Sequence, residues 1–160
     1  MLYLAPCQTI YERKAQALSL KENSKQIDFE KYHREIFNEW KNIQCVVVKF
    51  HPTFYLYSKN ILNKELKKIK DICLELGKEC VHIDEIAEFP YLHAVPAEIL
   101  VKYFKFSHVI GFDSAALLNL ATKNSFLKCI NYSDAFQCDE YENIVELYEM
   151  ANDNIEVIHL

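Results

Sequence analysis

The sequence predicts an α/β fold in which a parallel sheet is covered by helices on both faces. Short apolar runs typical of buried strands alternate along the chain with segments whose apolar residues recur every three or four positions. This alternation favours parallel strands joined by crossover helices. A chain of 160 residues that is 51% hydrophobic can bury a core of its own, so we expect a single domain over residues 1–160.

Six segments have the length and apolar character of strands. The run Cys45-Val46-Val47-Val48 is the strongest, because β-branched residues fill it, and it predicts the central buried strand. Together the expected strands are residues 2–7, 44–50, 80–83, 108–112, 126–130 and 155–159.

Five segments between these strands are expected to be helical. Asn63 is a candidate cap for one of them, and Gly77 can end that helix in the left-handed conformation. Pro96 fits the first turn of another helix. The expected helices cover residues 28–41, 63–76, 96–103, 114–122 and 140–151, and the polar stretch 21–25 is expected to be a surface connection.

Composition excludes several classes of function. The net charge of −5 argues against general binding to nucleic acids, and no apolar run approaches the length of a membrane span. Six cysteines without a CxxC pair are typical of buried free thiols, so we expect no zinc or other metal and a cytoplasmic location. With two glycines the chain has neither a GxGxxG fingerprint nor a Walker loop, so a bound phosphate would need helix N-termini and side chains.

Polar residues follow two of the expected strands directly. His51 comes after the central strand, and Pro52 keeps it out of the helical conformation, so its ring is expected to project beyond the strand end. Ser114 follows the strand at 108–112 and opens a helix, where its hydroxyl and the first backbone N–H groups can bind an anion. Ligands collect at such strand ends in open α/β sheets.

Each of these residues also has a structural interpretation. His51 can cap backbone groups of a turn, and Ser114 can be an ordinary helix cap in competition with Asp113. Glu98, in the first turn of the helix after Pro96, can interact with the helix dipole or accept hydrogen bonds from a ribose diol. The remaining histidines show no partner spacing and are expected to be structural or solvent-facing: His33, His82, His93, His108 and His159.

Three motifs in order resemble those of bacterial sialyltransferases. They are His51-Pro52, then Pro96-Ala97-Glu98-Ile99-Leu100, then Gly111-Phe112-Asp113-Ser114-Ala115-Ala116-Leu117, and they span about residues 44–121. The chain is most similar there to lipooligosaccharide sialyltransferases and their polysialyltransferase relatives. The resemblance implies a Rossmann-like domain equivalent to the C-terminal half of a GT-B glycosyltransferase, which holds the CMP part of CMP-sialic acid.

The resemblance also implies roles for single residues. His51, with Pro52, would contact the CMP phosphate and assist its departure, and Glu98 would hold the ribose hydroxyls. Ser114 and the adjoining N–H groups, including that of Ala115, would hold the phosphate. The family usually has a second hydroxyl residue where this chain has Ala115. CMP-sialic acid would be the donor substrate, and no separate cofactor is implied.

The family's acidic-acidic-glycine motif, which supplies the base toward the acceptor, does not occur in this sequence. We therefore expect a donor-binding domain that is incomplete as an enzyme on its own. Its glycan acceptor would be bound by an N-terminal domain absent here, and the full enzyme would associate peripherally with the inner membrane. The alternatives are a catalytically inactive nucleotide-binding or interaction module and a domain of a different nucleotide-sugar glycosyltransferase.

Overall fold

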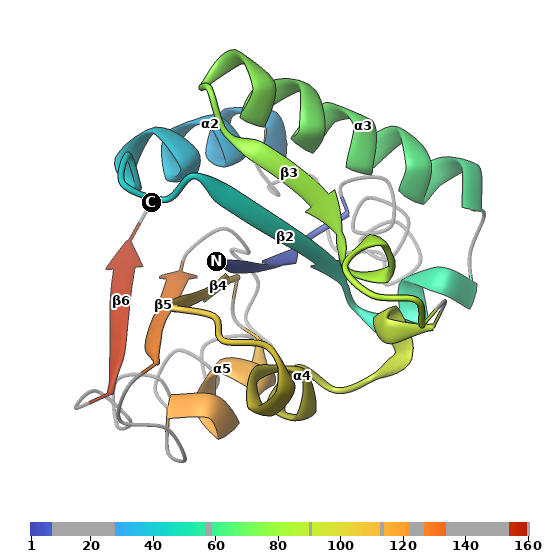
Figure 1. The fold of residues 1–160 in the computed structure, drawn as a ribbon. Coiled ribbons are helices and arrows are strands. Elements are labelled where there is room, and N and C mark those ends of the chain that lie inside the picture. Colours follow the sequence, from blue (N-terminus) through green and yellow to red (C-terminus); the bar gives the residue numbers. More distant parts are fainter. Residues whose placement is uncertain are drawn as a thin grey trace, which may run out of the picture. The chain divides into compact units, whose positions relative to one another are not determined.

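The computed structural model describes residues 1–7, 28–56, 59–89, 91–112, 114–121, 127–133 and 154–159. Its strands form a six-stranded sheet of order β3-β2-β1-β4-β5-β6 (Figure 1). The strands are β1 (Leu2–Ala5), β2 (Cys45–Phe50), β3 (Glu79–His82), β4 (His108–Gly111), β5 (Lys128–Ser133) and β6 (Ile155–His159). The expected α/β fold with a parallel sheet is confirmed, and the strand order is that of Rossmann sheets.

The helices occur where the apolar periodicity predicts them. They are α2 (Phe29–Glu39), α3 (Lys59–Glu75), α4 (Ala97–Tyr103) and α5 (Ala115–Ala121). Three short 3-10 turns, which the sequence did not indicate, follow strands or join helices: η1 (Pro52–Leu56), η2 (Ile83–Glu85) and η3 (Leu92–Ala94). The helix expected at 140–151, the connection at 21–25 and the cap candidate Asp113 lie outside the described residues.

Three details of the expected boundaries are wrong. Helix α3 begins at Lys59 and contains Asn63 in its exposed interior, because Leu62 already contributes to the buried face. Strand β5 continues to Ser133 because Asn131, a polar residue typical of a strand end, is fully buried in the sheet. Pro96 is the cap residue of α4, one position before the first turn.

Gly77 lies in the turn that ends helix α3, as expected. Its φ of 68° is the left-handed conformation that a residue without Cβ adopts at low cost. Gly77 N donates to Leu74 O at 3.0 Å and Lys78 N donates to Cys73 O at 2.8 Å, which is the Schellman pattern of a helix C-terminus. This turn delivers the chain into β3.

The chain divides into two compact units, and residues 5–94 form one of them. In this unit α2 and α3 pack side by side, and α3 also packs on β3 (Figure 1). Strand β2 pairs in parallel with β3, from Cys45 opposite Glu79 to Val48 opposite His82. The core between these elements is apolar: Phe29, Ile36, Phe37, Val46, Val48, Ile69, Ile72 and Cys73.

Residues 1–4 and 95–160 form the other unit. Strand β4 pairs in parallel with β1 and β5, and β5 pairs with β6. Helix α5 packs on β4 and β5 and contacts α4 (Figure 1). The core of this unit is also apolar: Leu2, Tyr3, Leu100, Val109, Ile110, Leu117, Leu120, Cys129 and Ile130.

Candidate functional site

The five residues predicted for the donor site are divided between the two units. His51 and Pro52 belong to the unit of residues 5–94, whereas Glu98, Ser114 and Ala115 belong to the other. Within each unit the predicted residues stand at or near the carboxyl end of a parallel strand, or on the helix beside it. This is the position where α/β sheets bind ligands.

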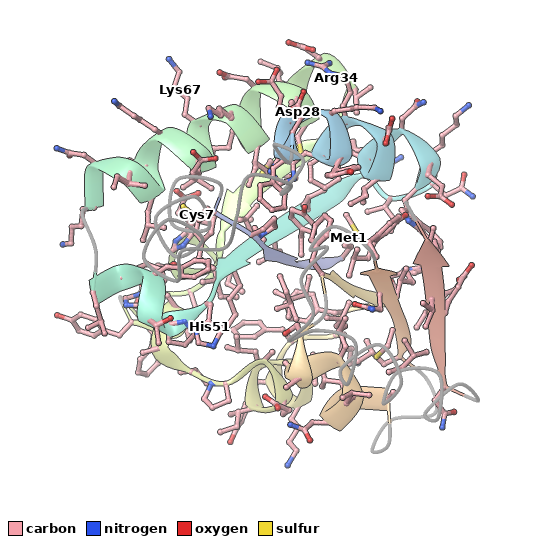
Figure 2. The ribbon with its side chains drawn as sticks, turned by 180° about the vertical axis from the view of Figure 1, so that it is seen from behind. Met1, Cys7, Asp28, Arg34, His51 and Lys67 are labelled. Atoms are coloured by element: carbon pink, nitrogen blue, oxygen red, sulfur yellow. The ribbon has the colours of Figure 1, made fainter. Side chains whose placement is uncertain are left out.

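His51 lies between the end of β2 and the start of η1 and is exposed; Figure 2 labels it. Its Nδ1 accepts a hydrogen bond from Thr53 N at 3.3 Å and lies 2.8 Å from Thr53 Oγ1. Because Nδ1 accepts from a backbone donor, the proton of the neutral ring is on Nε2. The histidine therefore caps its own turn through Nδ1 and carries the proton of the neutral ring on Nε2.

Pro52 explains why this turn forms directly after the strand. It is the first residue of η1, where its fixed φ suits a helical turn and its missing N–H is not needed. Phe54 N donates to His51 O at 2.9 Å, and the buried Phe54 side chain anchors the turn to the core. The histidine is thus held by a short, anchored turn.

Ser114 is placed by the junction of β1, β4 and α5. Leu4 is paired with Gly111 at the carboxyl ends of the neighbouring strands β1 and β4. In the sheet, β2 and β3 follow on one side of this pair, and β5 and β6 follow on the other. A Cβ on Gly111 would lie 3.2 Å from Leu4 Cβ and 3.4 Å from Leu117 Cδ1. The glycine therefore permits α5 to pack closely, with Ser114 immediately before its first residue, Ala115.

Ser114 has the backbone role of a helix cap. Its carbonyl accepts the hydrogen bond from Leu117 N at 2.8 Å, while its side chain is half-buried. Ala115 is exposed as the first residue of α5 and supplies only its backbone to any ligand. This arrangement suits an anion as well as a plain helix start.

Glu98 lies in the first turn of α4 and is joined to α5. Its Oε1 accepts a hydrogen bond from Asn119 Nδ2 at 2.9 Å, and none of the described residues bonds Oε2. The bond fixes the carboxylate beside α5. A carboxylate held by one oxygen can accept a ligand hydroxyl with the other.

A second polar cluster, formed by Tyr55, His82, Asp84 and His93, was not anticipated. Asp84 accepts two hydrogen bonds from His93, from the backbone N to Oδ1 at 2.8 Å and from ring Nδ1 to Oδ2 at 2.6 Å. The rings of Tyr55 and His93 are stacked with their centroids 3.9 Å apart. Tyr55 Oη lies 2.6 Å from His82 Nε2, so the cluster joins η1, β3, η2 and η3.

Charged residues fasten this cluster from both sides. The buried Lys49 donates from Nζ to His93 O at 2.6 Å. The Glu85 carboxylate accepts hydrogen bonds from His82 N at 3.1 Å and from Lys70 Nζ at 2.9 Å. The bond from Lys70 connects Glu85 to α3. These bonds to charged groups hold the turns η2 and η3 in place.

Burial sets the protonation of two members of the cluster. Desolvation lowers the pKa of His82, although Asp84 and Glu85 oppose the shift, so this ring is neutral at neutral pH. Desolvation also raises the pKa of Tyr55 well above its usual range, with the Asp84 charge acting in the same direction. Tyr55 therefore keeps its phenolic proton.

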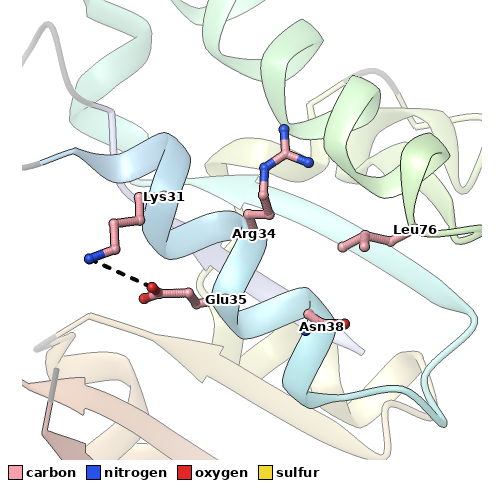
Figure 3. A pocket seen from close by; sticks show the side chains of 5 residues that line it. All are labelled: Lys31, Arg34, Glu35, Asn38 and Leu76. Atoms are coloured by element: carbon pink, nitrogen blue, oxygen red, sulfur yellow. Dashed lines mark ion pairs between the residues drawn. The ribbon is translucent and has the colours of Figure 1, made fainter.

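Other polar features fit a structural or surface role. A shallow hollow of about 380 Å³ is lined by side chains of α2 and by Leu76 (Figure 3). Lys31 and Glu35 form an ion pair there at 3.7 Å, and Arg34 is bound to Glu75, so the charges are already paired across an exposed surface. No group of three or more metal-ligating side chains occurs within the described residues.

Comparisons with known proteins identify no relative. No family model matches the sequence, no curated protein matches it, and no solved structure matches the fold. Among the described residues, no helix combines the length and apolar character that crossing a membrane requires. The function must therefore be inferred from the residues and geometry of this chain.

Sequence reasoning missed the cluster because its members are far apart. Tyr55 and His82 are 27 residues apart, and only the pairing of β2 with β3 brings their ends together. Asp84 and His93 are nine residues apart across two 3-10 turns with no periodic signal. The one available signal was Asp84, which directly follows the strand expected at 80–83 and stands two residues after His82.

Proposed function

We propose that this chain is the donor-binding part of a sialyltransferase-like glycosyltransferase that binds CMP-sialic acid. The observation that carries the proposal is His51, exposed directly beyond β2, with Nδ1 bonded to its own turn and the ring proton on Nε2. An N–H donor held in this way can bond a phosphate oxygen and stabilise the charge on the departing CMP. The motif resemblance supplies the identity of the nucleotide.

The unit of residues 1–4 and 95–160 supports the proposal independently. Glu98 Oε1 is held by Asn119, which leaves Oε2 to accept from a ribose hydroxyl. Ser114 stands three residues after the end of β4, at the point where the sheet order reverses direction, which is where nucleotides bind in Rossmann sheets. In the complete enzyme the transfer would invert the anomeric centre of sialic acid.

The proposal is tested by calorimetric titration with CMP, UMP and GMP. We expect CMP to bind with a Kd in the micromolar to millimolar range, or about −4 to −8 kcal/mol, and more tightly than UMP or GMP. Equal binding of the three nucleotides would point to a different nucleotide-sugar transferase. Absence of binding would favour an interaction module.

Two variants test the residues. His51→Ala should weaken CMP binding by roughly 1.5 to 3 kcal/mol, the range for a hydrogen bond to a charged group, with little change in Tm because His51 is exposed. Ser114→Ala should weaken binding too. The matched control is His108→Ala, because His108 stands at the amino end of β4 and bonds the Ser107 hydroxyl at 2.8 Å. CMP affinity unaltered by His51→Ala and Ser114→Ala would contradict the site assignment.

A further inference from the structure

The Asp84–His93 pair has the geometry of a proton-accepting dyad. Asp84 Oδ2 lies 2.6 Å from His93 Nδ1, and an ionised carboxylate can only accept, so the ring proton lies on Nδ1. In the neutral ring Nε2 then carries the lone pair. No described residue bonds Nε2. This is the tautomer that a general base requires.

Four contacts from three other residues hold His93 in place. Asp84 binds both its backbone N–H and its ring, Lys49 binds its carbonyl, and Tyr55 stacks on its face with centroids 3.9 Å apart. The dyad is nevertheless reachable, since the side chains of His93 and Asp84 are 19% and 23% exposed. A fixed, partly exposed base is arranged to meet a ligand.

The rim beside the dyad is aromatic. The Tyr91 ring stands edge-on to His93, with the ring centroids 6.2 Å apart, and Tyr91 is 72% exposed. Aromatic rings of this kind offer an apolar surface, and tyrosine adds a hydroxyl for hydrogen bonding. The surroundings therefore suit a hydroxyl-bearing ligand that can also pack on an aromatic ring.

We propose that Asp84 and His93 form an acid–base dyad that takes the proton of a hydroxyl group, supplied by a sugar or by water. The proton passes from the hydroxyl oxygen to Nε2, and the oxygen keeps the electron pair of the broken O–H bond. The Asp84 carboxylate stays ionised and stabilises the imidazolium that forms. The proposal concerns residues other than those assigned to the donor and does not depend on CMP binding.

Ethoxycarbonylation by diethyl pyrocarbonate tests the dyad on the intact chain. In this reaction the Nε2 lone pair attacks a carbonyl carbon, and ethyl carbonate leaves. The rate at His93 is measured at neutral pH by mass spectrometry with fragmentation, in the wild type and in Asp84→Asn. The substituted amide can still accept from His93 N through its oxygen, but its NH₂ group donates to Nδ1 and moves the ring proton to Nε2. We expect the rate at His93 to fall at least about tenfold, because the wrong tautomer has no lone pair on Nε2.

The matched control is Tyr55→Phe, which keeps the stacked ring but removes the hydroxyl bonded to His82. Its rate at His93 should match the wild type. An unchanged rate in Asp84→Asn, or an equal fall in Tyr55→Phe, would overturn the proposal, because the dyad would then act only as a tether. Should Asp84→Asn fail to fold, the ¹⁵N spectrum of wild-type His93 decides, since a proton on Nε2 also overturns it.

The source of the hydroxyl is distinguished by protection. The wild-type rate at His93 is measured with and without methyl β-galactoside, and with glycerol as a non-ring control. Slower reaction with the galactoside alone assigns a sugar hydroxyl. An unchanged rate excludes this sugar as the source of the hydroxyl.

Discussion

The clearest test of the core of the unit formed by residues 5–94 is the buried histidine of α2. His33 is 2% exposed, and its ring lies in a stack between Phe29 and Phe37 with centroids 6.3 Å from each. Desolvation lowers its pKa from 6.5 to about 3, with a further contribution from Lys68 and a smaller opposing one from Asp28. His33 is therefore neutral in the folded protein at every pH above about 3.

This shift predicts a loss of stability in mild acid. Between pH 6.5 and about 3 the unfolded chain binds a proton at His33 and the folded chain does not, so the free energy of unfolding falls as the pH falls. Each pH unit within this window corresponds to about 1.4 kcal/mol. From pH 7 to pH 5, His33 should remove about 2 kcal/mol of stability.

The assay compares urea unfolding of the wild type and His33→Phe at pH 7 and pH 5. Phenylalanine keeps an aromatic ring in the stack but does not titrate, so the variant should lose about 2 kcal/mol less between the two pH values. The carboxylates and other histidines titrate in both proteins, and their contributions cancel in the difference. Equal losses in the two proteins would refute the assignment of a desolvated, neutral His33.

Two further stability predictions concern the turns around β3. Gly77→Ala should lower the free energy of unfolding, measured in urea, by about 1 to 2 kcal/mol. The cost comes from the left-handed φ of 68° and not from a clash, because no atom lies within 4 Å of the new Cβ. A neutral effect would show that the turn relaxes. Lys78→Met should lower the free energy of unfolding by about 1 to 3 kcal/mol in the same assay. The reason is that the buried Nζ donates to Trp40 O at 2.8 Å and to Ile43 O at 2.6 Å. An unchanged stability would mean that water replaces both hydrogen bonds.

The sequence was sufficient for those parts of the fold that depend on local patterns. Apolar runs located all six strands, and the conformational freedom of Gly77 located the end of α3, because both signals arise from neighbouring residues. Residue Asn63 misled the assignment of α3, since a good cap residue is also tolerated on an exposed helix face. Local propensity cannot distinguish those two positions.

The candidate site was predictable only where it lies next to a strand in sequence. His51 and Ser114 were found because each lies within two residues of an apolar run, and the structure places His51 directly after β2 and Ser114 three residues after β4. The Asp84–His93 pair was not found, since its geometry depends on two 3-10 turns and on a ring from η1. Such contacts arise from the fold and leave no periodic trace.

The short turn η1 contacts both candidate functional groups of residues 5–94, the donor His51 and the Asp84–His93 dyad. His51 precedes this turn and caps it through Thr53 N, while Tyr55 within the turn stacks on His93 and bonds His82. Between them the Phe54 side chain is 5% exposed and fixes the turn to the core. Because a five-residue 3-10 turn is held at its start, middle and end, His51 and the Asp84–His93 dyad cannot be displaced independently without breaking one of these contacts. The turn η1 thus holds the donor His51 at its start and the base His93 through the stacked Tyr55 ring, and such preorganised groups are what acid–base chemistry requires of a protein scaffold.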